Sequence, residues 1–268
     1  GYRCDVASFV PIEFWVRART EIAKINPHFI WLAETVDKDF IRTIRSLGFS
    51  VHSDCDMYQA SDICYDYDVY EAFKSYLLGK SSLDLYIRRL QDQEVIYPGN
   101  YIKLRCLENH DQRRIASLVK TVEQLIMWTT FVYLQKGTTM IYAGQEAACK
   151  HTPSLFDVDK VDWSSYNKDG IADLMAKLAR LKKDDVMRDG VYTIMLGNIS
   201  ESVILKYETE LKTRVAIFNF GLKDGELSVD IPDGIYENLV GHSSIVVRNG
   251  YLHLEGEPIL IDVDNFKL

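Results

Sequence analysis

The chain has 268 residues, of which 47% are hydrophobic and 26% are charged, so it can bury a sizeable core as a globular protein. Its formal net charge of −8 argues against nucleic acid or an anionic membrane as a partner. The longest apolar stretch, residues 125–134, is about half as long as a membrane span requires and contains two threonines. We therefore expect this stretch to form a buried helix.

Strand and helix signals alternate over the first two thirds of the chain. Apolar residues at helical spacing predict helices over residues 11–25, 39–47, 69–78, 82–90, 122–135 and 171–183. Short apolar runs predict strands over residues 2–6, 29–33, 49–53, 102–107 and 138–142. Ser81 and Asp84 have the spacing of a capping box before the fourth of these helices. Strands that alternate with helices indicate a parallel sheet.

The last third of the chain shows only short β runs. They cover residues 192–196, 203–207, 215–220, 245–248, 251–254 and 259–263, and Asn249-Gly250 between two of them is a strong signal for a two-residue hairpin. We therefore predict two domains, an α/β domain over residues 1–187 and an all-β domain over residues 188–268.

Three carboxylates stand at or near the ends of strand-like runs. Glu34 follows residues 29–32, Asp111 lies shortly after residues 103–107, and Asp5 stands near the start of the chain. Strand ends at the rim of a parallel sheet or barrel are where functional side chains gather. A retaining glycosidase needs a carboxylate nucleophile and a carboxyl acid about 5 Å apart. Asp5 and Glu34 could fill these two roles.

Four short segments resemble signature regions of the α-amylase family of glycoside hydrolases. They are Arg3-Cys4-Asp5, Trp31-Leu32-Ala33-Glu34, Asn109-His110-Asp111 and Tyr142-Ala143-Gly144-Gln145-Glu146, in the family's order. The resemblance implies a partial (β/α)8 TIM barrel, comprising strands 4 to 8 and their helices. An antiparallel β-sandwich would follow this barrel.

The resemblance also implies roles for individual residues. Asp5 resembles the catalytic nucleophile, Glu34 the general acid/base, and Asp111 the third carboxylate, which stabilises the transition state. Arg3, Asn109 and His110 resemble the substrate-binding companions of these carboxylates. Arg3 shares a strand face with Asp5, because strand side chains alternate, and its cation would keep Asp5 ionised. No metal ligand or cofactor is assigned to this chain, although a structural calcium could belong to the missing part of the barrel.

The implied function is that of a retaining glycoside hydrolase acting on α-glucosidic bonds of α-glucans or maltooligosaccharides. Many calcium-dependent α-amylases have a Lys-His pair three and four residues after the nucleophile, whereas this chain has Ser8 and Phe9. This departure argues against action on long starch chains, and an enzyme that acts on shorter α-glucans, or a glucanotransferase of the same family, fits equally well. A non-catalytic relative that binds carbohydrate or another protein is a separate alternative.

The nucleophile of the family ends the fourth of eight barrel strands. We therefore expect a chain without the first three strands, inactive alone and able to self-associate through sheet edges at residues 2–6 and 138–142. Five cysteines, an odd number without metal-site spacing, suit free thiols in a reducing cytoplasm. No signal peptide is visible, which decides nothing about localisation.

Two further groups have competing interpretations. Asp66 and Asp68 could bind a cation, but an aspartate before a helix is more often a cap or a first-turn charge. Trp163, Tyr142 and Tyr166 could stack on sugar rings, whereas packing in the core is the competing interpretation.

Overall fold

The computed structural model describes residues 1–265, so the last three residues of the predicted C-terminal domain lie outside it. Contacts divide the chain into two compact units. The N-terminal unit comprises residues 1–105 and 137–139, and the C-terminal unit comprises residues 106–136 and 140–268. The domain boundary that we expect near residue 188 stays a prediction.

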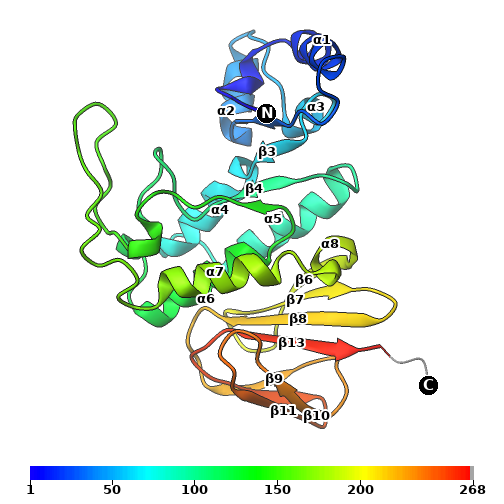
Figure 1. Ribbon diagram of the computed structural model, residues 1–268, viewed down its shortest axis with the longest axis vertical. Coiled ribbons are helices and arrows are strands. Elements are labelled where there is room, and N and C mark those ends of the chain that lie inside the picture. The colour runs from blue at the N-terminus through cyan, green and yellow to red at the C-terminus, as the bar shows by residue number, and fades with distance from the viewer. Residues whose placement is uncertain (266–268) are drawn as a thin grey trace. The chain divides into compact units, whose positions relative to one another are not determined.

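A five-stranded parallel sheet forms the centre of the N-terminal unit (Figure 1). Its strands follow one another in chain order: β1 (Tyr2–Cys4), β2 (Trp31–Ala33), β3 (Ile63–Tyr65), β4 (Lys103–Arg105) and β5 (Thr138–Thr139). Each neighbouring pair of strands is parallel. This order is that of successive strands in a (β/α) barrel, which confirms the predicted partial barrel.

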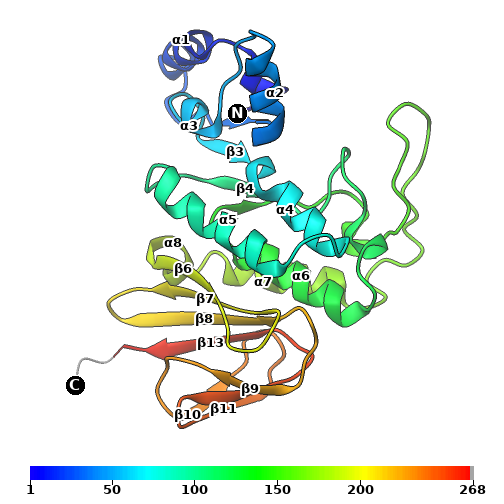
Figure 2. The ribbon, with the colours of Figure 1, turned by 180° about the vertical axis from the view of Figure 1, so that it is seen from behind.

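Helices connect the strands of the N-terminal unit (Figure 2). They are the 3-10 helix η1 (Ala7–Phe9) and the α-helices α1 (Ile12–Ala23), α2 (Lys38–Ser46), α3 (Asp54–Met57), α4 (Tyr67–Leu77) and α5 (Leu83–Ile96). Pro11 stands at the N-cap of α1, and the Asp37 carboxylate caps α2 by accepting two backbone hydrogen bonds. The four helices predicted in this part of the chain are confirmed, whereas α3 was not foreseen.

The strand predicted over residues 49–53 is wrong. This segment is a loop that ends at Ser53, where Ser53 and Asp56 form a capping box and start α3. The Val51 carbonyl accepts hydrogen bonds from the Arg45 guanidinium at 3.1 and 2.8 Å, in place of a neighbouring strand. The true strand is β3, a run of three residues too short to give a periodic signal.

The capping box predicted at Ser81 and Asp84 is also wrong. The N-cap of α5 is Ser82, whose side chain makes no capping hydrogen bond. The Asp84 carboxylate instead accepts a hydrogen bond from Arg88 Nε at 3.0 Å, one helical turn later.

Helix α6 (Val122–Leu134) is the buried helix of the C-terminal unit. Trp128 stacks on Phe220 with ring centroids 3.9 Å apart, and Phe131 meets Phe218 edge-on at 5.0 Å. A helix that is apolar on all sides must be covered on all sides, so this packing confirms the prediction for residues 125–134. Among the described residues, no helix is both long and apolar enough to cross a membrane.

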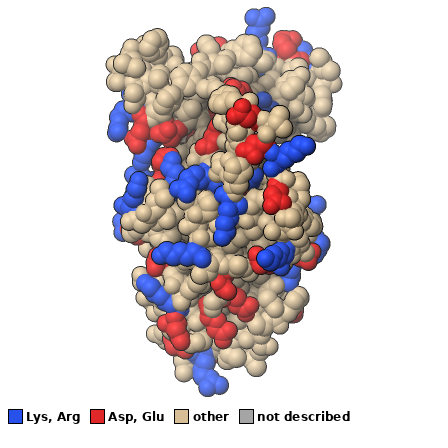
Figure 3. Space-filling model, turned by 90° about the vertical axis from the view of Figure 1, so that its left-hand side faces the viewer, with Lys and Arg blue, Asp and Glu red and all other residues tan. Residues whose placement is uncertain are grey.

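The remaining helices of this unit are short or lie on its surface. They are η2 (Ile115–Ser117), η3 (Gln145–Ala147), α7 (Ile171–Leu181) and α8 (Asp185–Asp189). Basic and acidic side chains are interspersed on the face of the described residues that Figure 3 draws.

Two four-stranded antiparallel sheets complete the C-terminal unit. The first has the order β13-β8-β7-β6 and comprises β6 (Val191–Leu196), β7 (Ser202–Glu208), β8 (Lys212–Asn219) and β13 (Ile259–Asp264). The second has the order β10-β11-β12-β9 and comprises β9 (Gly225–Ser228), β10 (Gly234–Glu237), β11 (Ser244–Arg248) and β12 (Tyr251–Leu254). Side chains from both sheets form one apolar core, including Ile217, Leu227 and Leu252. The predicted β-sandwich is confirmed.

The predicted Asn249-Gly250 hairpin is confirmed between β11 and β12. Both residues have positive φ angles, of 53° and 74°, as a two-residue hairpin of this type requires. The Asp233 carboxylate accepts hydrogen bonds from both backbone N–H groups, at 2.8 and 3.0 Å, which fixes the turn.

Candidate active site

Asp5 and Glu34 directly follow two adjacent parallel strands of the N-terminal unit. In the pairing of β1 with β2, Arg3 lies opposite Leu32 and Cys4 lies opposite Ala33. The residue that follows each strand is therefore one of the two carboxylates. The backbone N–H of Glu34 donates to the Cys4 carbonyl at 3.0 Å, which continues this pairing to the strand ends. Sequence position and register therefore bring Asp5 and Glu34 to one edge of the sheet.

The guanidinium of Arg3 bridges these two carboxylates. Its Nη1 donates to Asp5 Oδ1, and its Nη2 donates to Glu34 Oε1 at 2.5 Å. Its Nε donates to the Tyr65 hydroxyl at 3.4 Å, and the guanidinium carbon lies 5.6 Å from the Tyr65 ring centre. Burial lowers the pKa of Arg3, but the hydrogen bonds with Tyr65 and Asp5 outweigh burial and hold the pKa above its ordinary value.

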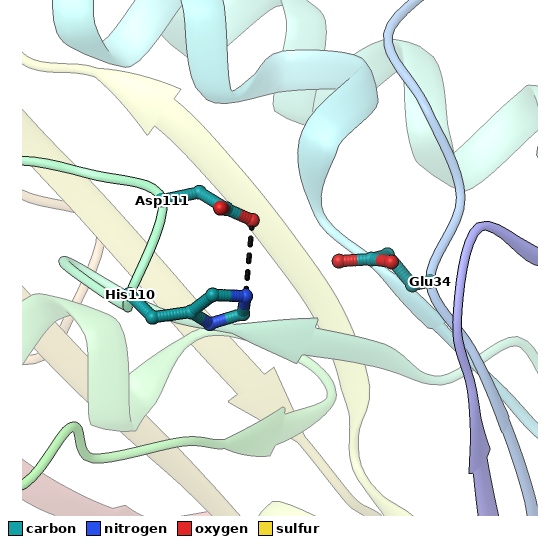
Figure 4. A group of neighbouring side chains, drawn as sticks. All are labelled: Glu34, His110 and Asp111. Carbon is teal, nitrogen blue, oxygen red and sulfur yellow. Dashed lines mark ion pairs between the residues drawn. The ribbon is translucent and has the colours of Figure 1, made fainter. Parts of the chain in front are cut away.

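Glu34 is the more protected of the two carboxylates. The Glu34 side chain is 10% exposed, whereas the Asp5 side chain is 74% exposed. Val6 adopts a left-handed conformation with φ 45°, and its N–H donates to Glu34 Oε2 at 2.9 Å. The strained turn at Val6 and the Arg3 guanidinium thus hold both oxygens of Glu34, whose side chain is drawn in Figure 4.

Asn109, His110 and Asp111 lie together in a loop of the C-terminal unit. Asn109 is buried, and its side-chain oxygen accepts a hydrogen bond from the Asp111 N–H at 2.9 Å. His110 Nε2 lies 3.3 Å from Asp111 Oδ2, a contact drawn as a dashed line in Figure 4. Both side chains are more than two-fifths exposed, so they are open to a ligand. Their placement relative to Asp5 and Glu34 stays a prediction.

A buried ion pair supports this loop, and sequence reasoning missed it. Glu108, immediately before Asn109, accepts hydrogen bonds from Arg114 Nη1 and from the Ile115 N–H, both at 2.7 Å. The Arg114 guanidinium lies 4.4 Å from the ring centre of Tyr142. Burial raises the pKa of Glu108, although Arg114 opposes this shift. The only sequence signal was the closeness of Glu108 and Arg114 to the Asn109-His110-Asp111 motif.

The segment 142–146 forms a tight turn beside Arg114. Gly144 has φ 96°, and a Cβ atom there would stand 2.8 Å from Val161 Cγ1, so glycine is required. The Gly144 N–H donates to Glu146 Oε2 at 2.9 Å, and the Gln145 N–H donates to the Tyr142 carbonyl, also at 2.9 Å. This motif therefore positions the ring of Tyr142 against Arg114.

Asp66 stands at the N-cap of α4 and Asp68 in its first turn, where the cap and first-turn interpretation placed them. Asp66 makes no capping hydrogen bond, and its carboxylate accepts one from Arg105 Nη1 at 2.7 Å. Asp68 accepts from Lys103 Nζ at 2.8 Å, and the same ammonium donates to Asp54 at 2.6 Å. Burial would raise the pKa of Asp68, but Lys103 lowers it below its ordinary value. These carboxylates therefore belong to a buried charge network in which Lys103 and Arg105 are their cationic partners.

Trp163 and Tyr166 do not pack in the core. They are 47% and 58% exposed, on the loop that follows the turn at residues 142–146. Ser8 is fully buried, and Phe9 meets Phe40 edge-on at 5.7 Å, so these two positions after Asp5 offer no charged ligand to a metal. Taken singly, neither unit brings three metal-ligating side chains together among the described residues.

The sequence matches family models over most of its length. Residues 9–192 match the model for the alpha amylase catalytic domain, and residues 195–261 match the bacterial alpha amylase C-terminal domain. The catalytic match includes Glu34, His110 and Asp111 and begins four residues after Asp5.

Curated relatives give the same assignment. The chain is 21% identical over 194 residues to Alpha-amylase 2 of Dictyoglomus thermophilum, a match that covers 68% of this chain. It is 24% identical over 179 residues to Alpha-amylase 1 of Schwanniomyces occidentalis, which covers 64% of this chain. The matched part amounts to 32% and 34% of these two relatives, so the chain spans about a third of their length.

Solved structures resemble nearly the whole chain. An alpha-amylase from Lactobacillus plantarum is 35% identical with a TM-score of 0.92, and the match covers 98% of this chain and 62% of that one. A maltogenic alpha-amylase from Thermotoga neapolitana is 28% identical with a TM-score of 0.84, covering 99% and 62%. The catalytic-domain model alone accounts for more than half of the residues, and the chain therefore belongs to the α-amylase family.

Proposed function

We propose that this chain supplies part of the active site of a retaining glycosidase that cleaves α-glucosidic bonds. The observation that carries the proposal is the shared guanidinium of Arg3, which holds Asp5 and Glu34 at the ends of adjacent strands. Two carboxylates bound to one guanidinium are compatible with the separation of about 5 Å that retention requires. Asp5 is exposed, as a nucleophile that must reach a sugar has to be.

The proposed reaction has two steps. In the first step, a carboxylate oxygen of Asp5 bonds to the anomeric carbon while the glycosidic bond breaks and Glu34 gives its proton to the leaving oxygen. In the second step, Glu34 takes a proton from water, and the water oxygen replaces Asp5 at the anomeric carbon. Arg3 stabilises the charged form of Asp5 before it attacks and after it is released, since a protonated carboxyl is a poor nucleophile.

The acid step requires a change at Glu34. In this structure both of its oxygens accept hydrogen bonds, from Arg3 and from the Val6 N–H, as an ionised carboxylate does. We expect substrate binding to draw Arg3 towards Asp5 alone, which would free one oxygen of Glu34 for a proton. Asp111 and His110, both exposed, would bind sugar hydroxyls, and Asn109 would hold Asp111 in place.

The proposed substrates are α-glucans and maltooligosaccharides. The names of the matched proteins support this class, since they are alpha-amylases and a maltogenic alpha-amylase. An assay of the full-length protein for reducing sugar released from maltooligosaccharides tests the proposal. Absence of both hydrolysis and transfer at high enzyme concentration would favour a non-catalytic carbohydrate-binding relative instead.

A glucanotransferase is the second candidate, and Phe9 favours it. The residue is partly exposed four positions after Asp5, where it packs against Phe40. An apolar surface near the nucleophile favours a sugar acceptor over water in the second step. Product analysis with maltotriose distinguishes the two candidates, because transfer yields chains longer than the substrate.

Two proposals concern the surroundings of the protein. None of the five cysteines, all of them among the described residues, forms a disulfide, which is usual for proteins in a reducing compartment, so we propose a cytoplasmic location. The parallel sheet ends at β1 and β5, and the partly exposed strand β1 leaves backbone groups available to a second copy of the chain.

A further inference from the structure

A cavity of about 580 Å³ lies within the C-terminal unit, outside the residues assigned to catalysis. Its walls are the segment from Arg114 to Leu125, which includes the start of α6, and the loop from Ala147 to Asp169. This loop is the projecting green segment in Figure 1. The volume is that of a site for a small organic molecule.

Basic side chains outnumber acidic ones on the cavity wall. The wall contains two acidic residues and five basic ones, although the net charge of the chain is −8. The basic residues are Arg114, Lys120, Lys150, Lys160 and Lys168. Among the described residues, the ammonium groups of these four lysines have no ion pair or hydrogen bond. Some other surface lysines do have an acidic partner, as Lys24 has in Glu21 and Lys74 in Glu71. The wall therefore carries a net excess of positive charge.

Arg114 adds a fixed donor to this wall. The residue is 1% exposed; its Nη1 donates to Glu108 and its Nε to the His151 carbonyl at 3.1 Å. Its Nη2 has no hydrogen-bond partner among the described residues. The ion pair with Glu108 and the ring of Tyr142 hold the guanidinium rigidly, so its free N–H groups are already in position for a ligand.

The two acidic residues of the wall set a limit on the ligand. Asp162 stays ionised, because the backbone N–H of Ser164 donates to it at 2.9 Å and lowers its pKa. Together, Asp162 and Asp169 offset part of the lysine charge, so a singly charged anion gains little electrostatic free energy on binding. A doubly charged anion gains more electrostatic free energy from the remaining positive charge.

We propose that this lysine pocket, the cavity lined by Arg114, Lys120, Lys150, Lys160 and Lys168, binds a phosphate group, carried either by inorganic phosphate or by a phosphorylated sugar. Lysine ammonium groups are mobile point charges that adapt to phosphate oxygens, and an arginine fork adds directed N–H donors. The volume leaves room for a sugar attached to the phosphate.

Isothermal titration calorimetry of the purified protein with inorganic phosphate, glucose 6-phosphate and glucose tests the proposal. Both phosphates should bind, glucose should not, and affinity should fall as sodium chloride is added. The double variant Lys150→Gln/Lys160→Gln should weaken phosphate binding about tenfold, because the loss of each exposed charge should weaken it about threefold. The matched control Lys80→Gln/Lys183→Gln removes two exposed lysines outside the pocket and should leave affinity unchanged.

The possible outcomes are distinct. Tighter binding of glucose 6-phosphate than of phosphate would identify a sugar phosphate as the ligand, and equal affinities would identify free phosphate. Equal binding of glucose and glucose 6-phosphate, or full affinity in the Lys150/Lys160 variant, would overturn the proposal. The Asp5→Asn variant should bind phosphate as wild type does. A failure of phosphate binding is therefore distinguishable from a failure of the proposed glycosidase function.

Discussion

Arg3 donates a hydrogen bond from Nη2 to Glu34 Oε1 at 2.5 Å, and this contact joins the ends of two neighbouring strands. The same guanidinium binds Asp5, so one cation serves two carboxylates. A change at any of these three residues therefore alters the electrostatics of the other two.

Asp5→Asn should abolish turnover of maltooligosaccharides by the full-length protein, with a loss of about 10⁴-fold or more, because an amide cannot act as the nucleophile. Steady-state release of reducing sugar measures the effect. Asp39→Asn is the control, since Asp39 is an exposed aspartate on α2 that pairs with Arg42. Comparable losses in both variants would point to misfolding rather than to catalysis.

Glu34→Gln should depend on the leaving group of the substrate. We expect a loss of about 10²- to 10⁴-fold on maltooligosaccharides, whose leaving oxygen needs a proton. Glucosyl fluoride needs no such proton, so the variant should keep most of its activity on it. Parallel assays on the two substrates measure the ratio. An enzyme equally impaired on both would exclude Glu34 as the acid.

Tyr65→Phe should lower kcat about three- to tenfold and leave KM nearly unchanged, because the Arg3 Nε loses its neutral hydrogen-bond acceptor. The Tyr65 ring remains near the guanidinium, so Arg3 should be less well oriented rather than displaced. Tyr67→Phe, a tyrosine two residues later on α4, is the matched control. A change confined to KM would show that Tyr65 acts on substrate binding instead.

Asp262→Asn should destabilise the β-sandwich by about 2 kcal/mol at pH 7, since the Asp262 carboxylate binds the buried Arg214 at 2.7 and 2.9 Å. Burial raises the pKa of Asp262, but Arg214 and Lys212 lower it below its ordinary value. The stabilisation is therefore complete above about pH 3.9 and is lost as the pH falls through the depressed pKa.

Urea unfolding of both proteins at pH 7 and pH 3 measures this effect. The difference between wild type and Asp262→Asn should shrink at the lower pH. Asp264→Asn, an exposed aspartate two residues later on β13, should behave like wild type at both pH values. A difference that stays constant with pH would show that the charge of Asp262 is not what stabilises the sandwich.

The purified chain should self-associate through the edges of its parallel sheet. Sedimentation should show species larger than the 30.9 kDa monomer, with a proportion that rises with concentration. Tyr2→Lys, on the exposed edge strand β1, should reduce association because a lysine disfavours strand pairing. Tyr251→Lys, on the sandwich, should not. A monomer at every concentration would contradict this prediction.

Features encoded by neighbouring residues were predictable from the sequence. The Asn249-Gly250 turn needs two residues that tolerate positive φ, and α6 needs only a continuous apolar run. The closeness of Asp5 and Glu34 also followed from local signals, because consecutive parallel strands deliver the residues after them to one edge. Strand β3 was missed, because its three residues are too few to show a repeating pattern of apolar residues.

The sequence by itself determined the family, the alternation of strands and helices, the β-sandwich and the candidate carboxylates. Only the tertiary structure decided that Arg3 holds Glu34 as well as Asp5, and that Lys103 is buried between Asp54 and Asp68. Arg3 and Glu34 stand 31 positions apart, and Lys103 and Asp54 stand 49 apart. Local patterns constrain backbone torsions and side-chain faces, whereas the partner of a charge depends on which segments the folded chain brings together.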